Sequence, residues 1–171
     1  FPTCPVPPTS SRQVGTTVSK RLSKISFTIV KHGQVDSSFP GLLALGGSGG
    51  IKKVEFWSPG VNCQLPDLSR YMDSPSVNFI QDTIVACYGD SCDKLQQGAW
   101  VKMADTRQNR SDHTSEVIGD SILLIGGTDS PTTTELVGVT GESVEGFSLG
   151  PGGRREHCSV KISDRTVVII G

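Results

Sequence analysis

Two segments of the chain carry arginine, an acid and histidine in the same order, and these groups could serve acid–base chemistry. Arg110 precedes His113 by three residues, Arg154 precedes His157 by three, and an acidic residue stands just before each histidine. A catalytic pocket needs different groups that converge on one place, whereas these groups recur 44 residues apart. We therefore expect both sets to be structural, with each histidine bonded to or stacked on an adjacent strand.

The acids beside the two histidines are Asp112 and Glu156. Each lies close to an arginine, so we expect Asp112 to pair with Arg110, and Glu156 to pair with Arg154 or Arg155. Ion pairs of this kind at a protein surface contribute about 0–1 kcal/mol. Such pairs would support a scaffold rather than a reaction.

The chain has five cysteines, an odd number that leaves at least one thiol without an intramolecular partner. Cys87 and Cys92 flank a turn-like Tyr-Gly-Asp-Ser stretch, and we predict a disulfide bond between them. Closing so short a loop contributes about 2 kcal/mol. Cys4 and Cys63 are a second candidate pair, and the sequence does not fix the pairing of these two or of Cys158. Five buried, reduced cysteines in a cytosolic protein are the alternative.

Asn109 begins an Asn-Arg-Ser triplet, which fits the acceptor pattern for N-linked glycosylation. The polar residues 106–109 around it indicate an exposed loop. Disulfide bonds persist in oxidising compartments. The triplet and the Cys87–Cys92 pair together therefore predict an extracellular or secreted protein, with a cytoplasmic one as the alternative.

An apolar run that ends in glycine recurs along the chain at a spacing of about 40 residues. The glycines that close the successive runs are Gly46 and Gly47, Gly89, Gly126 and Gly127, and Gly171. In the second copy, Tyr88 stands where the others have their first glycine. The runs are short, rich in β-branched residues and bounded by turn residues, which indicates buried strands. Each copy predicts a small antiparallel sheet that becomes stable by packing on its neighbours.

The residues around these runs indicate turns and anchors. A glycine pair lets the backbone take positive φ or approach a neighbouring strand closely. Gly119-Asp120 and Ser163-Asp164 separate apolar runs and predict hairpin turns. Trp100 and Phe147 are the expected apolar anchors that follow the second and third runs.

From about residue 32 to residue 171 the chain resembles the kelch repeat, a blade of a β-propeller in the superfamily of the galactose oxidase central domain. The resemblance rests on the glycine phrase, the arginine three residues before histidine, the Val-Glu-Phe-Trp-Ser-Pro run at 54–59, and Trp100. The chain departs from the pattern at Tyr88 and in the third unit, which lacks the tryptophan. The resemblance implies an all-β fold of kelch-type propeller blades, each a four-stranded antiparallel sheet.

Propeller enzymes similar to galactose oxidase hold copper with tyrosines and two histidines, and one of those tyrosines is cross-linked to cysteine. This chain has only Tyr71 and Tyr88, and its histidines recur at equivalent repeat positions. We therefore predict no catalysis by this segment, no cofactor and no metal site. A fragment of such an enzyme, with its site on blades outside this sequence, is one alternative.

Two parts are expected along the chain. Residues 1–23 form a Pro-rich and basic N-terminal segment, and residues 24–171 form kelch-like blades, three units and the start of a fourth. Propellers close with about 4–8 blades, and the last run stops at Gly171, where other copies continue. We expect an incomplete ring that further blades or another chain complete.

Charge and loop composition limit the partners. The formal net charge of −1 argues against a nucleic-acid partner, and no apolar stretch approaches the ~20 residues of a membrane span. Loops on a rigid scaffold carry binding, and the candidate loops are Gly89–Gln97 and Thr128–Thr134. The expected binding residues are Asp90, Ser91, Asp129 and Thr132. We expect an extracellular module that binds a protein or glycan or is structural; an intracellular kelch adaptor is the other alternative.

Overall fold

The computed structural model describes residues 19–22, 25–30, 41–45, 52–58, 61–72, 74–163 and 165–171. These residues form fourteen β-strands and no helix. The strands in chain order are β1 (Ser19–Leu22), β2 (Ile25–Val30), β3 (Gly41–Leu45), β4 (Val54–Ser58), β5 (Val61–Leu65), β6 (Ser76–Ile80), β7 (Thr83–Gln96), β8 (Ala99–Arg110), β9 (Thr114–Ile118), β10 (Ser121–Ile125), β11 (Thr133–Gly138), β12 (Ser143–Ser148), β13 (Cys158–Ser163) and β14 (Thr166–Ile170).

The strands form four separate antiparallel sheets. The first sheet has the order β1-β2-β3-β4-β5, the second β6-β7-β8, the third β9-β10-β11-β12, and the fourth contains β13 and β14. Consecutive strands pair throughout, so each sheet is an up-and-down meander. None of these sheets closes into a barrel within the described ranges. The predicted all-β class is confirmed, although only the third sheet has four separate strands.

The path of β7 explains why the second sheet has three strands and not four. The Cα atoms of Cys87 and Cys92, both in β7, are 4.0 Å apart, whereas a straight strand would separate them by about 16 Å. Thr83 Oγ1 also donates to the carbonyl oxygen of Leu95, at 2.6 Å. We conclude that β7 doubles back on itself, and its first arm pairs with β6 while its second arm pairs with β8. The second sheet therefore has four extended segments, like the third.

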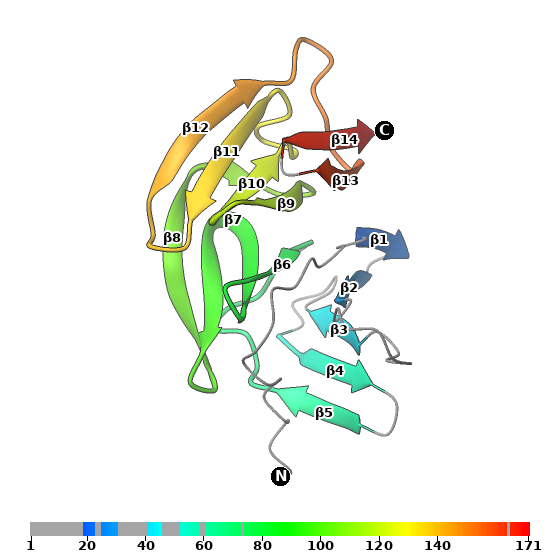
Figure 1. The fold of residues 1–171 in the computed structure, drawn as a ribbon, viewed down its shortest axis with the longest axis vertical. Coiled ribbons are helices and arrows are strands. Elements are labelled where there is room, and N and C mark those ends of the chain that lie inside the picture. The colour runs from blue at the N-terminus through cyan, green and yellow to red at the C-terminus, as the bar shows by residue number, and fades with distance from the viewer. Residues whose placement is uncertain are drawn as a thin grey trace.

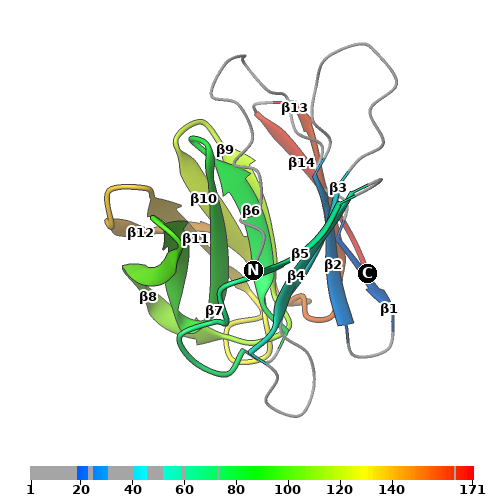
Figure 2. The same ribbon diagram turned by 90° about the horizontal axis from the view of Figure 1, so that it is seen from below.

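The four sheets follow one another around a common centre (Figure 1). The first strands of the last three sheets, β6, β9 and β13, are neighbours near this centre, whereas β8 and β12 lie at the periphery. In the view from below, the fourth sheet stands beside β1 of the first sheet (Figure 2). The arrangement is an incomplete, propeller-like all-β fold.

Two apolar clusters fill the junctions between sheets. The cluster between the first and second sheets contains Leu45, Val54, Leu68, Met72, Val77, Ala86, Tyr88 and Trp100. The cluster between the second and third sheets contains Ile80, Val85, Cys87, Cys92, Ala104, Ile122, Leu124 and Val137. Successive side chains of a strand point to opposite faces, so the second sheet contributes to both clusters.

The two expected anchors differ in outcome. Trp100 is buried in the first of these clusters, and its Nε1–H donates to the carbonyl oxygen of Pro66 at 2.9 Å. The prediction for Phe147 is wrong, because its side chain is 57% exposed. Phe147 lies on β12, an edge strand of the third sheet.

The turn at Gly119-Asp120 is a hairpin, as predicted. It joins β9 to β10, and Gly119 has a φ of +59°, a backbone conformation that glycine adopts without strain. In the other predicted turn, Asp164 lies outside the described residues.

Candidate functional site

Two loops leave neighbouring sheets at equivalent points and contain the four residues predicted to bind. The disulfide turn (residues 88–91) follows the first arm of β7, and the glycine loop (residues 126–132) joins β10 to β11. Cys87 pairs with Ser76 on β6, just as Ile125 pairs with Thr114 on β9. The two loops are therefore at the same end of their sheets.

The last residues of β8 lie between these loops and contact both. Thr106 Oγ1 donates to the carbonyl oxygen of Gly89 in the disulfide turn, at 3.3 Å. Ser130 Oγ in the glycine loop donates to the carbonyl oxygen of Asn109, at 3.4 Å. The loops and the end of β8 thus form one continuous surface, which we take as the candidate site.

A buried arginine holds the glycine loop from beneath. The Arg110 guanidinium, whose side chain is 2% exposed, forms an ion pair with Glu135 at 3.2 Å. It also donates to the carbonyl oxygens of Gly126, Ser130 and Thr133, at 2.8, 3.3 and 3.1 Å. The loop is therefore fixed at its two ends and in its middle. Arg110 was expected to form a surface ion pair, with Asp112; its side chain is instead buried and forms its ion pair with Glu135, on another strand.

The glycine pair lets the next segment of chain approach this loop. A Cβ on Gly126 would collide with the carbonyl oxygen of Arg154, and one on Gly127 would lie 2.8 Å from that of Ser111. The N–H of Gly127 donates to Arg154 O at 2.9 Å, and that of Thr128 donates to Ser111 O at 2.8 Å. The predicted close approach at this pair is confirmed.

The glycine loop presents its outermost residues to solvent. Thr128 and Asp129 are exposed. Thr132 is half-buried, and its carbonyl oxygen accepts a hydrogen bond from the N–H of Leu149 at 2.7 Å. A partner would therefore meet Thr128 and Asp129 first, while Thr132 contributes mainly to the shape of the loop.

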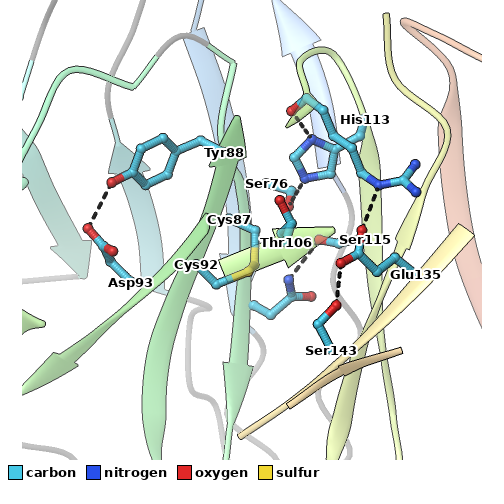
Figure 3. The surroundings of a disulfide bond; sticks show 12 residues. Ser76, Cys87, Tyr88, Cys92, Asp93, Thr106, His113, Ser115, Glu135 and Ser143 are labelled. Carbon is cyan, nitrogen blue, oxygen red and sulfur yellow. Dashed lines mark hydrogen bonds and ion pairs between the residues drawn. A yellow bond between two sulfur atoms is a disulfide. The ribbon is translucent and has the colours of Figure 1, made fainter. Parts of the chain in front are cut away.

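The disulfide turn is closed by the Cys87–Cys92 bond, the pair that the sequence favours. Figure 3 shows this bond between the Tyr88–Asp93 pair on one side and the Ser76–His113 pair on the other. The Tyr88 hydroxyl donates to Asp93 Oδ2 at 2.8 Å, and burial raises the pKa of Tyr88.

The chain segment before β6 is attached to the same turn. Ser69 Oγ donates to Asp93 Oδ2 at 2.6 Å. Arg70 lies over the Tyr88 ring, 4.2 Å from its centroid, and also donates to the Tyr88 hydroxyl. Its Nη1 forms an ion pair with Asp90 at 3.0 Å. The turn is therefore held by polar contacts as well as by the disulfide.

Two predictions about this turn need correction. Ser91 is 0% exposed and cannot meet a partner directly, because the tight reversal points its side chain inward. The expected loop Gly89–Gln97 is not one loop, since most of it belongs to the second arm of β7 and pairs with β8. Asp90 is exposed, so it is the residue of this turn that is available to bind.

The inner strands are joined by four side-chain hydrogen bonds, which we call rungs. The rungs are Ser76–His113 at 2.7 Å, Asn78–Ser115 at 2.7 Å, Thr114–His157 at 2.8 Å and Glu116–Ser159 at 2.8 Å. Along residues 113–116, alternate side chains bond to opposite neighbours. His113 and Ser115 bond to residues of β6, and Thr114 and Glu116 bond to residues at the start of β13. The partners are 37 residues apart in the first two rungs and 43 in the others, so the rungs follow the sequence repeat.

Both histidines act in these rungs as neutral side chains. The Nδ1 of His113 lies 2.9 Å from the carbonyl oxygen of Arg110, so Nδ1–H donates there and Nε2 accepts the proton of the Ser76 hydroxyl. Burial, aided by the charge of Arg110, lowers the pKa of His113 to about 4. Burial and then the charge of Arg154 lower the pKa of His157. This geometry agrees with the structural role predicted for both residues.

Asn109 is exposed, as expected, but it lies in β8 and not in a loop. The prediction of a loop at residues 106–109 is wrong, because these polar residues belong to β8. Here β8 pairs irregularly with β7, and β8 also packs beside the third sheet. The Asn109 Oδ1 atom lies 3.3 Å from where a Cβ of Gly89 would be. A glycan on Asn109 would consequently emerge next to the disulfide turn.

Several residues of the site could not be chosen from the sequence. The repeat pattern of the sequence does not mark Glu135, Asp93 or Arg70. Their contacts with Arg110, Tyr88 and Asp90 become visible only in the folded chain. The rung residues carried a usable signal, because polar residues recur in these strands at repeat spacing, as Ser76 and Asn78 in β6 and as Thr114-Ser115-Glu116 in β9.

Other predicted residues fall outside the described part of the chain or at its margin. Gly46, Gly47 and Cys4 are outside the described residues, and so is the side chain of Cys63 in β5. Cys158 is a free and exposed cysteine. No three His, Cys, Asp or Glu side chains in the described ranges are grouped so as to hold a metal ion. Within the same ranges, no helix has the length and hydropathy to cross a membrane.

No protein-family model and no curated protein is significantly similar to this chain.

Proposed function

We propose that this chain is an extracellular, kelch-type propeller module that binds a protein or a glycan through the candidate site. The observation that carries the proposal is the clamp of Arg110 beneath the glycine loop. A loop already held in one conformation loses little entropy on binding. An exposed loop that is fixed in this way is suited to recognition.

The chemistry of the exposed residues suggests the kind of group that is recognised. The loops present the carboxylates of Asp90 and Asp129 and the hydroxyl of Thr128. Carboxylates and hydroxyls accept hydrogen bonds from sugar hydroxyls and from basic side chains. The partner is therefore a glycan or a protein surface with basic residues.

The repeated histidines and arginines support binding over catalysis. His113, His157 and Arg110 are all engaged in contacts between or beneath the strands. The exposed loops are the part of this site that is left to meet a partner.

The binding is tested with fluorescently labelled protein on a glycan array and, in parallel, on cultured cells with and without trypsin treatment. We expect binding in one of these arms, and we expect Asp129→Lys to weaken it at least roughly tenfold. Glu145→Lys is the matched control, because Glu145 is an exposed carboxylate on β12 and the charge change is the same. Absence of binding in both arms, or binding that Asp129→Lys and Asp90→Lys leave unchanged, would refute the proposal.

The compartment is tested on the natural protein. Non-reducing peptide mapping should find Cys87 bonded to Cys92, and peptide N-glycosidase treatment should change the mass of the Asn109 peptide. Free thiols at both cysteines and an unmodified Asn109 would favour the intracellular adaptor instead.

A further inference from the structure

The end of β8 bulges opposite the tip of the disulfide turn. The register between β7 and β8 shifts between Gly89 and Ser91. Asp90, the residue between them, therefore lies opposite the whole stretch 106–109 of β8. A strand that carries extra residues against its neighbour bends locally and re-aims its side chains. Neighbouring side chains of this stretch are consequently free to point toward different loops.

The contacts of residues 108 and 109 show these directions. The Gln108 amide oxygen accepts a hydrogen bond from Thr133 Oγ1 at 2.8 Å, so Gln108 is directed to the third sheet. The Asn109 carbonyl oxygen accepts from Ser130 Oγ, at 3.4 Å, in the glycine loop. The Asn109 side chain points to the other loop, since its Oδ1 lies 3.3 Å from where a Cβ of Gly89 would be. A group attached to this side chain would therefore extend over the disulfide turn.

The tip of the disulfide turn is open to such a group. The side chain of Asp90 is 73% exposed, although its carboxylate is paired with Arg70. In the triplet Asn109-Arg110-Ser111, Asn109 has the pattern of an acceptor for an N-linked glycan, and such a glycan is bulky. Modification of one side chain would therefore decide whether Asp90 is accessible.

We propose that an N-linked glycan on Asn109 covers the disulfide turn, so that the partner meets the glycine loop. This role rests on the binding function and the extracellular location proposed above. It divides the candidate site in two, because Asp90 is masked whereas Thr128 and Asp129 stay exposed. The direction of the Asn109 side chain makes the difference, since a side chain aimed at the glycine loop would mask the other half.

Carbodiimide-driven labelling of carboxylates, followed by peptide mass spectrometry, tests the masking without any partner. The protein is secreted from cultured animal cells, and the wild type is compared with Ser111→Ala, which loses the acceptor pattern but keeps Asn109. Ser111→Thr is the matched control, because it changes the same position and keeps the pattern. We expect Asp90 to be labelled several-fold more slowly in the wild type and in Ser111→Thr than in Ser111→Ala. Asp129 should be labelled at the same rate in all three.

Both substitutions preserve the contact that Ser111 makes with the glycine loop, because its backbone carbonyl oxygen accepts the hydrogen bond from Thr128. Three outcomes would each overturn the proposal. They are an unmodified Asn109 in the secreted protein, equal labelling of Asp90 with and without the acceptor pattern, and masking of Asp129 together with Asp90.

Binding to the glycan array or to cells reports on the same division of the site. Asp129→Lys should weaken binding in the wild type and in the Ser111→Ala background. Asp90→Lys should weaken it in the Ser111→Ala background and leave it unchanged in the glycosylated wild type. An equal effect of Asp90→Lys in the two backgrounds would show no coupling between glycan and loop and would overturn the proposal. Absence of binding in every background would refute the binding function instead, and the labelling would still decide whether the glycan covers the turn.

Discussion

The second and third sheets hold their loops at the same structural position by different chemistry. In the third sheet, a buried Arg110–Glu135 pair and a glycine pair fix the loop. In the second sheet, the disulfide bond closes a short turn. Met72 lies three residues before Pro75, just as Arg110 lies three residues before His113. The second sheet therefore has a fully buried methionine at the position where the third sheet has its arginine.

The difference between these two regions shows what each solution requires. A polar clamp needs every buried charge and carbonyl group satisfied at once. It also needs glycine, because the next segment contacts the loop backbone directly. The covalent clamp closes its turn with two cysteines, is supported by the Arg70–Asp90 ion pair, and tolerates Tyr88 at the glycine position. The third sheet should therefore be the more sensitive of the two to single substitutions.

The largest loss of stability is expected from Arg110→Met. This substitution gives the third sheet the residue type that the second sheet has at the equivalent position, Met72. Glu135 would stay buried without its cation, and removing one partner of a buried ion pair costs about 3–5 kcal/mol. Urea denaturation should show this fall in the free energy of unfolding.

The control for that substitution removes both charges. The double variant Arg110→Met/Glu135→Met should recover only part of the loss, since it removes the unpaired charge but still leaves the carbonyl oxygens of Gly126, Ser130 and Thr133 without their donor. If Arg110→Met alone cost less than about 1 kcal/mol, the polar clamp would not be what holds the third sheet.

The next effect is expected from Gly126→Ala. Gly126 has a φ of +61° and an added Cβ would meet the carbonyl oxygen of Arg154, so we expect a loss of about 3 kcal/mol from strain and overlap. Gly98→Ala is the matched control, because Gly98 has a φ of +78° and open space around it. It should cost about 1 kcal/mol by thermal denaturation. Equal losses would show that backbone conformation alone, and not close approach, explains the glycine pair.

A third effect depends on pH. The pKa of His113 is about 4 in the folded protein and about 6.5 when unfolded, so the unfolded chain binds more protons between these values. The free energy of unfolding should therefore fall as pH decreases from about 6.5 to about 4, by roughly 3 kcal/mol.

Urea denaturation across this pH range, compared between the wild type and His113→Gln, isolates that effect. Burial raises the pKa of Glu116, which acts in the opposite direction, but this contribution is present in both proteins and cancels in the difference. An equal pH dependence in the two proteins would mean that His113 is not held neutral between the sheets.

The smallest effect is expected from the disulfide bond. The variant Cys87→Ala/Cys92→Ala should lose about 2 kcal/mol, because the bond closes a short loop. Urea denaturation under the same conditions allows direct comparison with Arg110→Met. A loss greater than that of Arg110→Met would reverse the comparison between the sheets.

The sequence predicted those features of the fold that depend on local spacing. The glycine phrase indicated strands and hairpins, and Cys87 and Cys92 indicated their own bond. It failed where contacts come from distant segments. Arg110 meets Glu135, 25 residues away, because two strands face each other across a junction. The burial of Ser91 depends on how tightly β7 reverses, and composition alone does not determine that.

The rungs have a consequence for the order in which the protein opens. Each rung joins a sheet only to its neighbour, so the rungs link the second, third and fourth sheets in series and contribute to stability as a sum of neighbouring interfaces. Among the described residues, rungs join the fourth sheet to the third sheet alone, whereas the third sheet has rungs to two neighbours. Amide hydrogen exchange in β13 and β14 should therefore proceed through local opening of that end, while β9 and β10 exchange only when a larger part of the array unfolds.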